Sequence, residues 1–446
     1  MRKTAAVVTL ALLGSAGAAT ITPSGTAPKP ILPASVSAFN VGNWMPVIEA
    51  VDPLGALQPG ALRWPGGNIG DEQNRTPQAM QTLKTNWTLL GQPPLMLQTR
   101  VFSRAGGDRD GTAARNTPED AAELVRMARE LGLNVAYYEI GNEPDLYATN
   151  RSDPSWTPEK YCGAVRAQKA AILNVDPQAR IAGPAVSNPG PFLDAAIREC
   201  GDAFDLVTWH LYPSNGDGSD AQAFDSIRRV TDTVKRVETL WSDPATNPKG
   251  HGRPLAQGVT EYAQSYRSDR STHLSDAVGG LWAAEAALRL SESGAVFNTY
   301  FSLMATGNHG LLDDAGFPRM SYAAFRELAH YRGQTLGVTS DDPEVWVHAA
   351  QQGSRLTLFA INTRATPQPL TLDLPGFAVI GAKTVTDADV MADQPPRALR
   401  IGGPLMLPPL SLTRVVLKAA PKASVASRPF SVHFANKPTP TSPRKP

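Results

Sequence analysis

Cysteine is scarce in this sequence, and the two that occur, Cys162 and Cys200, belong to no metal-binding pattern. No Cys-x-x-Cys or His-Glu-x-x-His sequence is present, so the sequence offers no common zinc motif and we expect no bound metal. Both cysteines lie on segments with helical character that follow neighbouring predicted strands. A disulfide between them and two separate buried thiols are both compatible with the sequence.

The sequence also lacks an excess of charge of either sign. Its 42 Lys and Arg residues face 41 Asp and Glu residues, which gives a formal net charge of +1. Nucleic-acid-binding proteins need a basic excess on one face, so we do not expect nucleic acid as a partner. Charged residues make up 19% and hydrophobic residues 42% of the chain, a ratio that excludes wholesale disorder and allows a substantial core.

Long hydrophobic runs are confined to the N-terminus. Met1-Arg2-Lys3 gives a positive start, residues 4–16 are mostly apolar, and residues 16–19 are small. This pattern predicts a secretory signal peptide over residues 1–19, because its apolar part is shorter than the roughly 20 residues of a membrane span. No cysteine lies near the cleavage site, so we expect no lipid anchor. The prediction is a secreted or periplasmic protein with no membrane attachment after cleavage.

Strand and helix patterns alternate over most of the chain. Helical stretches are expected from Thr117 to Gly132, from Thr157 to Val175, and at roughly 221–241 and 273–293, with Thr-Pro pairs at the start of the first two. Such alternation predicts parallel β/α units, and eight strands in about 270 residues fit a (β/α)8 barrel over residues 33–335. A doubly wound open sheet is the alternative, but the Gly-rich phosphate turn usual after its first strand is missing. The eight expected strands cover residues 34–40, 61–64, 94–98, 135–140, 180–184, 205–210, 257–262 and 297–303.

The pattern changes after Tyr331. Apolar and polar residues alternate in several short segments that Pro and Gly separate, which predicts a small antiparallel β-sandwich over residues 336–418. Residues 21–32 are a candidate for an additional strand of this sandwich. Residues 419–446 carry five basic residues and no acid and are rich in Pro, Ser, Thr and Ala, so we expect a disordered basic tail.

Two glutamates follow predicted barrel strands. An apolar strand runs into Gly141-Asn142-Glu143 and breaks at Pro144, and Glu261 closes the candidate seventh strand in the same way. Barrel enzymes place their catalytic groups at the carboxyl ends of the strands. Two carboxylates facing one cavity suit cleavage of a glycosidic bond, since one donates a proton while the other attacks the sugar or activates water.

Asn142-Glu143-Pro144 followed by Glu261 resembles the clan A glycoside hydrolases, which are retaining (β/α)8 enzymes, some with an appended β-sandwich. The resemblance covers nearly the whole mature chain except the tail. The Leu62–Asn68 segment, Leu-Arg-Trp-Pro-Gly-Gly-Asn, resembles a motif of the family 51 arabinofuranosidases. Glu139–Pro144 and the Thr-Trp-His-Leu-Tyr segment Thr208–Tyr212 resemble equally the family 79 glucuronidases and heparanases and the family 39 xylosidases.

The resemblance implies roles for individual residues. Glu143 would be the acid/base and Glu261 the nucleophile, whereas the residues by themselves do not assign which is which. Asn142 would bind the sugar 2-hydroxyl. Arg63 would lie near Glu261 and keep it ionised. Tyr212, or alternatively His210, would reach the nucleophile.

Further substrate contacts are expected from residues near these motifs. Trp64 and Tyr262 could stack on sugar rings, Asn68 could bind a hydroxyl, and His210 ends a strand. Glu139 points into the barrel four residues before Glu143, so we expect it in a buried ion pair or hydrogen bond. Related enzymes often carry a Trp platform after strand eight, but this chain reads Asn-Thr-Tyr-Phe-Ser-Leu-Met over Asn298–Met304. Tyr300 or a loop aromatic would substitute for it.

The sequence therefore predicts a secreted retaining glycoside hydrolase that acts without a cofactor on a glycoside, oligosaccharide or polysaccharide. A non-catalytic carbohydrate-binding protein on the same fold is the alternative of a different class. A transglycosidase, which would use the same two glutamates, is the third. The sugar, the linkage, and exo or endo action are not determined by the sequence.

Overall fold

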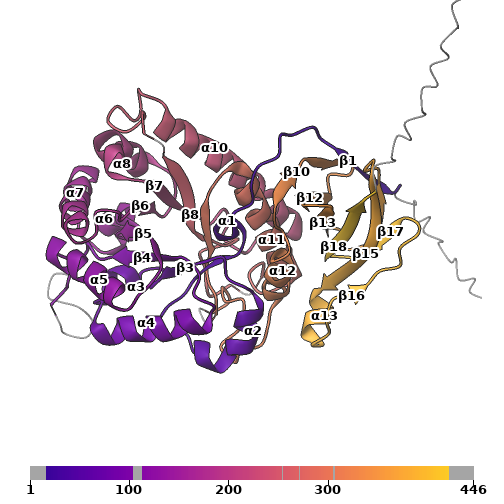
Figure 1. The fold of residues 1–446 in the computed structure, drawn as a ribbon, viewed down its shortest axis with the longest axis horizontal. Coiled ribbons are helices and arrows are strands. Elements are labelled where there is room, and N and C mark those ends of the chain that lie inside the picture. Colours follow the sequence, from indigo (N-terminus) through magenta and orange to yellow (C-terminus); the bar gives the residue numbers. More distant parts are fainter. Residues whose placement is uncertain (1–16, 104–112, 254, 271, 305–306, 421–446) are drawn as a thin grey trace, which may run out of the picture.

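The computed structural model describes residues 17–103, 113–253, 255–270, 272–304 and 307–420. Within these residues the chain forms a barrel and a β-sandwich that pack side by side (Figure 1). Most of the predicted signal peptide and nearly all of the predicted basic tail lie outside the described residues. No described helix is long and apolar enough to cross a membrane.

The barrel is closed by eight parallel strands, and its last strand pairs with its first. This confirms the (β/α)8 prediction over the open-sheet alternative. Two expected strands are shorter than predicted. Pro33 starts a helical turn, α1 (Pro33–Val36), where the sequence suggested extended chain, and the eighth strand, expected to reach residue 303, ends at Tyr300. The strands are β2 (Ala38–Asn40), β3 (Ala61–Trp64), β4 (Leu95–Thr99), β5 (Val135–Ile140), β6 (Ile181–Val186), β7 (Leu206–Leu211), β8 (Ala256–Tyr262) and β9 (Phe297–Tyr300).

Helices surround the barrel. Thr117 caps α5 with a reciprocal bond to Asp120, and Thr157 caps α7, as the Thr-Pro pairs predicted. The predicted helix over residues 221–241 is instead two helices, α9 and α10, separated at residues 226–227. The principal helices are α2 (Val51–Ala56), α3 (Ile69–Glu72), α4 (Pro77–Leu89), α5 (Pro118–Glu130), α6 (Tyr147–Asn150), α7 (Pro158–Val175), α8 (Pro191–Cys200), α9 (Asp220–Asp225), α10 (Arg228–Ser242), α11 (Ala277–Ser293) and α12 (Met320–Leu328).

A disulfide joins Cys162 on α7 to Cys200 on α8, with 5.7 Å between the Cα atoms. Both residues are buried in the main hydrophobic core. The structure thus decides between the two possibilities that the sequence left open.

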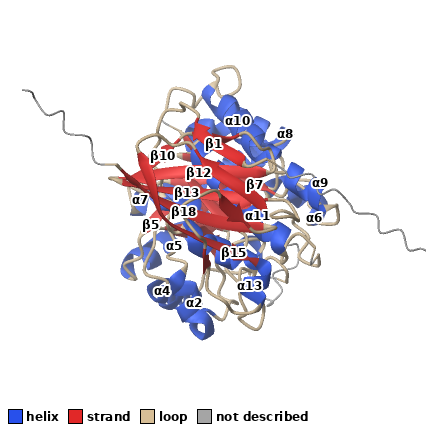
Figure 2. Ribbon diagram, turned by 90° about the vertical axis from the view of Figure 1, so that its right-hand side faces the viewer, coloured by secondary structure: helices blue, strands red, loops and turns tan. Residues whose placement is uncertain are grey.

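The sandwich consists of a four-stranded and a six-stranded sheet, in the strand orders β11-β1-β14-β17 and β10-β12-β13-β18-β15-β16. Figure 2 shows the strands of this domain in front of the barrel. The segment expected to add a strand does so as β1, which begins at Ala19, a residue we placed in the signal peptide. β1 pairs parallel with β14, whereas the other sandwich pairs are antiparallel. The strands are β1 (Ala19–Pro23), β10 (Gln334–Leu336), β11 (Val338–Ser340), β12 (Val345–Gln352), β13 (Arg355–Asn362), β14 (Gln368–Leu372), β15 (Phe377–Thr386), β16 (Arg397–Ala398), β17 (Leu405–Leu407) and β18 (Ser411–Ala419), with α13 (Asp387–Met391) after β15.

A buried histidine ties the sandwich to the barrel. His348 on β12 contacts Glu285 and Glu292 of α11, at 2.9 Å from each carboxylate. The two carboxylates raise the pKa of His348 to about 10, although burial works in the opposite direction. A protonated imidazole between two glutamates therefore fixes the position of the sandwich on α11.

We expect His348→Gln to lower the free energy of unfolding by about 3 kcal/mol at pH 6, because Glu292 would lose its cation and the buried Glu285 would keep only Arg289. The pKa of His348 rises from 6.5 to about 10 in the folded protein, so its stabilisation is complete below about pH 6.5 and is lost as the pH approaches 10. Denaturant titrations of the wild type and the variant should therefore converge between pH 7 and 10. Exposed His330→Gln is the control, and an equal loss at pH 6 and pH 10 would contradict this account.

Candidate active site

Glu143 stands on a sharp turn at the carboxyl end of β5. Its backbone is left-handed, with φ of 48°, and Pro144 begins the following short helical turn. The Glu143 amide donates to the carbonyl of Ala185 at 2.8 Å, which fixes the turn against β6. A non-glycine residue in this region is strained, and such residues cluster at functional sites.

Glu261 lies on β8, opposite His210 of β7. The β7–β8 register shifts just before this pair, an irregularity of the kind that re-aims side chains beside active sites. Three donors bind the Glu261 carboxylate: Arg63 at 2.7 Å, the Gly67 amide at 3.0 Å and the Tyr212 hydroxyl at 2.8 Å. Of the two residues expected to reach Glu261, Tyr212 makes the shorter contact, whereas His210 lies 3.6 Å away.

Arg63 is fully buried and connects the two strands that carry the glutamates. It binds Glu139 at 2.6 Å, Glu261 at 2.7 Å and the side-chain oxygen of Asn142 at 2.8 Å. Glu139 is thus in the buried ion pair that its interior position predicted. The guanidinium leaves Glu261 flanked by a fixed positive charge.

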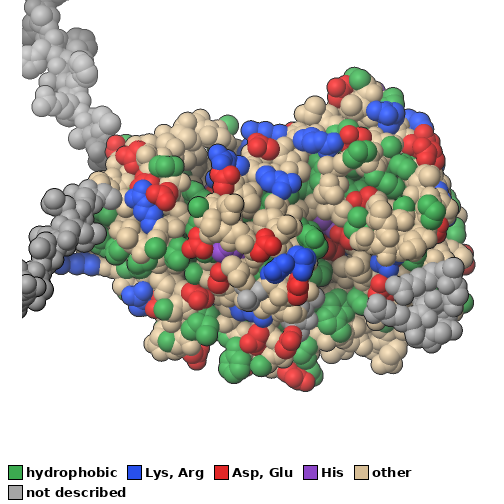
Figure 3. Space-filling view, turned by 180° about the vertical axis from the view of Figure 1, so that it is seen from behind, with side chains coloured by type: hydrophobic (Ala, Val, Ile, Leu, Met, Phe, Trp, Pro, Cys, Tyr) green, Lys and Arg blue, Asp and Glu red, His purple; other side chains and the backbone are tan. Residues whose placement is uncertain are grey.

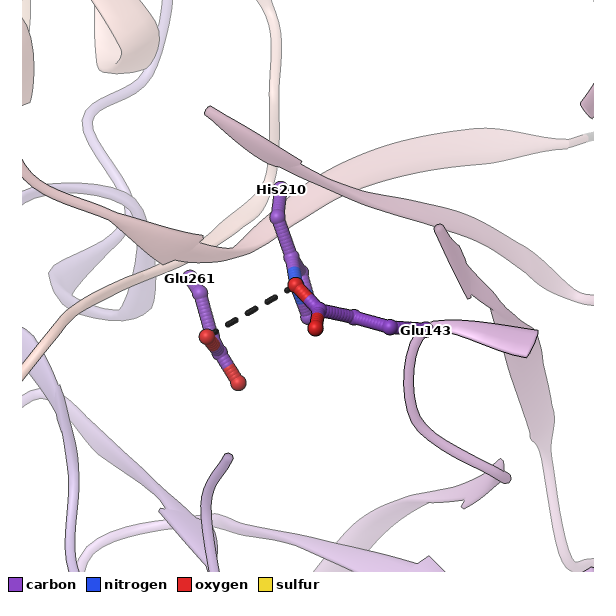
Figure 4. Close-up of side chains that lie close together, drawn as sticks. All are labelled: Glu143, His210 and Glu261. Carbon is purple, nitrogen blue, oxygen red and sulfur yellow. Dashed lines mark hydrogen bonds and ion pairs between the residues drawn. The ribbon is translucent and has the colours of Figure 1, made fainter. Parts of the chain in front are cut away.

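His210 lies between the two glutamates (Figure 4). Its Nδ1 atom is 2.9 Å from Glu143 Oε1 and 3.6 Å from Glu261 Oε2. Burial lowers the pKa of His210, but the two carboxylates outweigh burial and raise it above its ordinary value. The Nδ1–Oε1 distance is that of a hydrogen bond between His210 and Glu143.

The two glutamates have opposite pKa shifts. Burial raises the pKa of Glu143, and the nearby negative charge of Glu261 adds to this, against the hydrogen bond from His210. Burial would also raise the pKa of Glu261, but His210, Arg63 and Tyr212 hold it below its ordinary range. Near neutral pH the site therefore favours keeping a proton on Glu143 over keeping one on Glu261. Two carboxyl groups driven apart in this way are suited to acid and nucleophile roles.

A second layer of contacts holds the loop beside Glu143. The buried Asp71 accepts a hydrogen bond from the Tyr147 hydroxyl at 2.6 Å, and the Asn142 amide donates to the same hydroxyl at 3.4 Å. Burial raises the pKa of Asp71 to about 6. Sequence reasoning did not find this pair, because Asp71 and Tyr147 lie 76 positions apart and belong to no motif.

Of three residues expected to contact the sugar, two are buried and one is exposed. Trp64 and Tyr262 are at most 2% exposed and belong to the hydrophobic core, so we correct their expected stacking role. Tyr262 packs edge-on against Tyr300, with 5.6 Å between the ring centroids, and Trp64 donates its indole N–H to Asn43 at 2.8 Å. Asn68 is exposed above Asn142 and accepts from Arg151 at 3.1 Å, which leaves it accessible to a hydroxyl.

The aromatic residue at the end of the eighth barrel strand is Phe301 rather than Tyr300. Tyr300 is buried in the core, whereas Phe301 is partly exposed. A Cβ atom at Gly67 would lie 3.1 Å from the Phe301 ring and 3.9 Å from Glu261 Oε1, so Phe301 lies beside the carboxylate. His309, which no motif indicated, packs edge-on against Phe301 at 5.5 Å and lies 6.3 Å from the ring of Tyr212.

Glu143, His210 and Glu261 each offer one ligand atom, and these atoms lie within 4.8 Å of one another. Such a group could hold a metal ion. Arg63 already bonds Glu261, however, and its guanidinium places a fixed positive charge beside the position that a metal ion would take. The donor set therefore fits a proton-transfer site better than a metal site. Figure 3 shows a face of the barrel that is hollowed, with acidic and histidine side chains visible in the hollow.

The fold is a closed (β/α)8 barrel with an appended β-sandwich. No protein-family model matches the sequence, and no curated protein matches it. Solved structures match over nearly their whole length, and they show the fold that this chain shares with glycoside hydrolases of families 44 and 51. The resemblance to family 51 is thereby confirmed at the level of fold, and family 44 is a neighbour that the sequence did not suggest.

Three of these structures illustrate the similarity. A family 51 α-L-arabinofuranosidase from Bifidobacterium longum has a TM-score of 0.68 and 16% identity, over 89% of this chain and 99% of that one. An α-L-arabinofuranosidase from Thermotoga maritima has a TM-score of 0.68 and 13% identity, over 90% and 99% of the two chains. A family 44 xyloglucanase from Paenibacillus polymyxa has a TM-score of 0.65 and 14% identity, over 91% and 100%.

Proposed function

We propose that this protein is a retaining glycoside hydrolase in which Glu143 is the acid/base and Glu261 the nucleophile. One observation carries the proposal: oxygen atoms of the two carboxylates lie within 4.8 Å of each other, with opposite pKa shifts. Retaining enzymes hold their carboxyl groups about 5 Å apart, whereas inverting enzymes leave about 6.5–9.5 Å for a water molecule.

In the first step Glu261 attacks the anomeric carbon, and the glycosidic C–O bond breaks as Glu143 gives its proton to the leaving oxygen. The sugar is then held as an ester of Glu261. In the second step the Glu143 carboxylate takes a proton from water, the water oxygen bonds to the anomeric carbon, and Glu261 is released. No metal or organic cofactor is needed for either step.

The surrounding residues supply binding and orientation. Asn142 is held by Arg63 through its side-chain oxygen, and its side-chain nitrogen donates to Asn68 at 3.5 Å, which leaves one hydrogen for the sugar 2-hydroxyl. Asn68 is placed for a further hydroxyl, and Phe301 with His309 forms one wall beside Glu261. Phe301 follows the eighth barrel strand, the position at which related enzymes often carry a Trp platform.

Carbohydrate substrates also fit the activities of the structural neighbours, which include arabinofuranosidases, a xyloglucanase and a glucanase-xylanase. Export is supported by the predicted signal peptide and by the disulfide between Cys162 and Cys200, since disulfides persist in oxidising compartments. We therefore propose a secreted or periplasmic enzyme.

The test is turnover of aryl α-arabinofuranoside, β-xyloside, β-glucuronide, β-glucoside and β-galactoside, with the product followed by proton NMR. We expect one of these to be cleaved with the anomeric configuration of the first-formed product retained. An inverted product would contradict the proposed mechanism. Binding of oligosaccharides without any turnover would favour the carbohydrate-binding alternative, and a product that shifts to a larger glycoside when a sugar acceptor is added would favour the transglycosidase.

A further inference from the structure

A groove of about 920 Å³ lies between the barrel and the sandwich, where the two domains meet. Helices α9, α10 and α11 form one wall, and β11, β12 and the chain near Arg364 form the other. Its size lies within the range of ligand sites, about 300–1,000 Å³. Neither Glu143 nor Glu261 lines it, so it is separate from the candidate active site.

Trp346 is the aromatic surface of this groove. It lies on β12, and the Phe224 ring of α9 supports it edge-on at 5.4 Å. The indole is partly exposed, and within the described residues its N–H makes no hydrogen bond. An indole with a free donor and an accessible face can stack on a sugar ring while it binds a hydroxyl.

The charges along the groove are mixed and paired. Arg289 binds Glu285, Arg228 binds Asp225, and Arg364 binds Asp342 and Glu344. With Asp220 the lining holds five carboxylates, and with His348 it holds four cationic side chains. Neither sign dominates, so the lining fits an uncharged ligand. The paired groups still offer N–H donors and carboxylate lone pairs, which neutral hydroxyl-rich molecules require together.

The groove also lies near the catalytic end of the barrel. β7 carries His210 and ends at Leu211, and α9 begins at Asp220, nine residues later. The intervening loop lies against the chain that follows β8, because the Ser214 amide donates to the Gln264 carbonyl at 3.2 Å. The loop that links the candidate active site to α9 therefore also leads to the groove wall.

We propose that this groove is a second glycan-binding site, which takes a neutral segment of a polysaccharide with Trp346 as its stacking surface. The proposal rests on the proposed function for its substrate class. By this proposal the sandwich helps to bind a polysaccharide, in addition to packing against α11.

The experiment compares Trp346→Ala and Arg228→Gln, with Met391→Ala as an exposed apolar control elsewhere on the sandwich. Binding of soluble xyloglucan and arabinoxylan is measured by calorimetry on Glu261→Gln protein, which does not consume the ligand. For the polymer that binds, we expect Trp346→Ala to weaken affinity about tenfold and Arg228→Gln to weaken it severalfold, as loss of a central aromatic contact does. When the same two substitutions are made in protein that keeps Glu261, kcat/KM for the aryl glycoside should stay at the wild-type value in both variants.

Unchanged polymer affinity in both variants would overturn the proposal, as would an equal loss of aryl glycoside turnover in Trp346→Ala. If Trp346→Ala does not fold, Arg228→Gln decides, because its side chain is largely exposed. Failure of the proposed function gives a different result, namely no turnover of any glycoside by the wild type. Even in that case, polymer binding that depends on Trp346 would support a glycan-binding site in the groove.

Discussion

Glu261→Gln is expected to lower kcat/KM for the preferred glycoside by about 10⁴-fold or more, the scale seen when a catalytic nucleophile is removed. The amide cannot form the glycosyl ester, so the first step has no acceptor for the anomeric carbon. The fold should survive, because Arg63 keeps its ion pair with Glu139 and the glutamine oxygen still accepts from Tyr212. The thermal midpoint should therefore remain close to that of the wild type.

Initial rates and the thermal midpoint are measured for Glu261→Gln beside Glu199→Gln, a half-exposed glutamate paired with Lys249. Sodium azide gives a second readout with Glu261→Ala, since a small anion can occupy the space of the lost carboxylate. A glycosyl azide with inverted configuration would identify Glu261 as the nucleophile. Activity within tenfold of the wild type would rule out that role.

The Glu143→Gln variant is expected to lose more activity on substrates with a poor leaving group than on substrates with a good one. Dinitrophenyl glycosides leave without a proton and should keep the first step, whereas an alkyl or sugar leaving group should lose about 10²–10⁴-fold, the contribution of general acid catalysis. The glutamine can still accept from His210, so the position of the imidazole is retained. A loss that is the same for all leaving groups would contradict the acid role.

The pH profile gives the second readout for Glu143. Activity needs Glu261 ionised and Glu143 protonated, so the rate of the wild type rises as Glu261 loses its proton and falls as Glu143 does. The pKa of Glu261 lies below 4.5 and that of Glu143 above it, which places the active range between them. In Glu143→Gln the alkaline limb should disappear and the acid limb should remain. Retention of both limbs would assign the alkaline limb to another group, such as His210.

Part of the candidate site could be predicted from the sequence, because the positions of some of its residues follow from the strands that carry them. Glu143 and Glu261 each follow an apolar strand, and parallel strands of a barrel bring their carboxyl ends to one face whatever the loops contain. Glu139 was assigned to the interior by its spacing of four from Glu143 along one strand. These predictions needed only periodicity along a strand and the closure of the barrel.

Trp64, Tyr262 and Phe301 show the limit of that reasoning. All three lie next to motif residues, yet the first two pack in the core and only Phe301 is partly exposed. Alternation along a strand places a side chain on one face, but the turn that follows decides whether the next residue faces the cavity. His309 and the Asp71–Tyr147 pair come from loops and helices without any motif, so their positions depend on contacts made only after folding.

The sequence by itself determined the barrel, the appended sandwich and the positions of the two glutamates, because each follows from local periodicity and from the geometry of parallel β/α units. Only the tertiary structure decided that Cys162 meets Cys200, that Arg63 binds both Glu139 and Glu261, and that His348 joins the domains. The physical reason is that a disulfide or a buried ion pair needs atoms within a few ångströms across elements far apart in the chain, and local pattern carries no information about that distance.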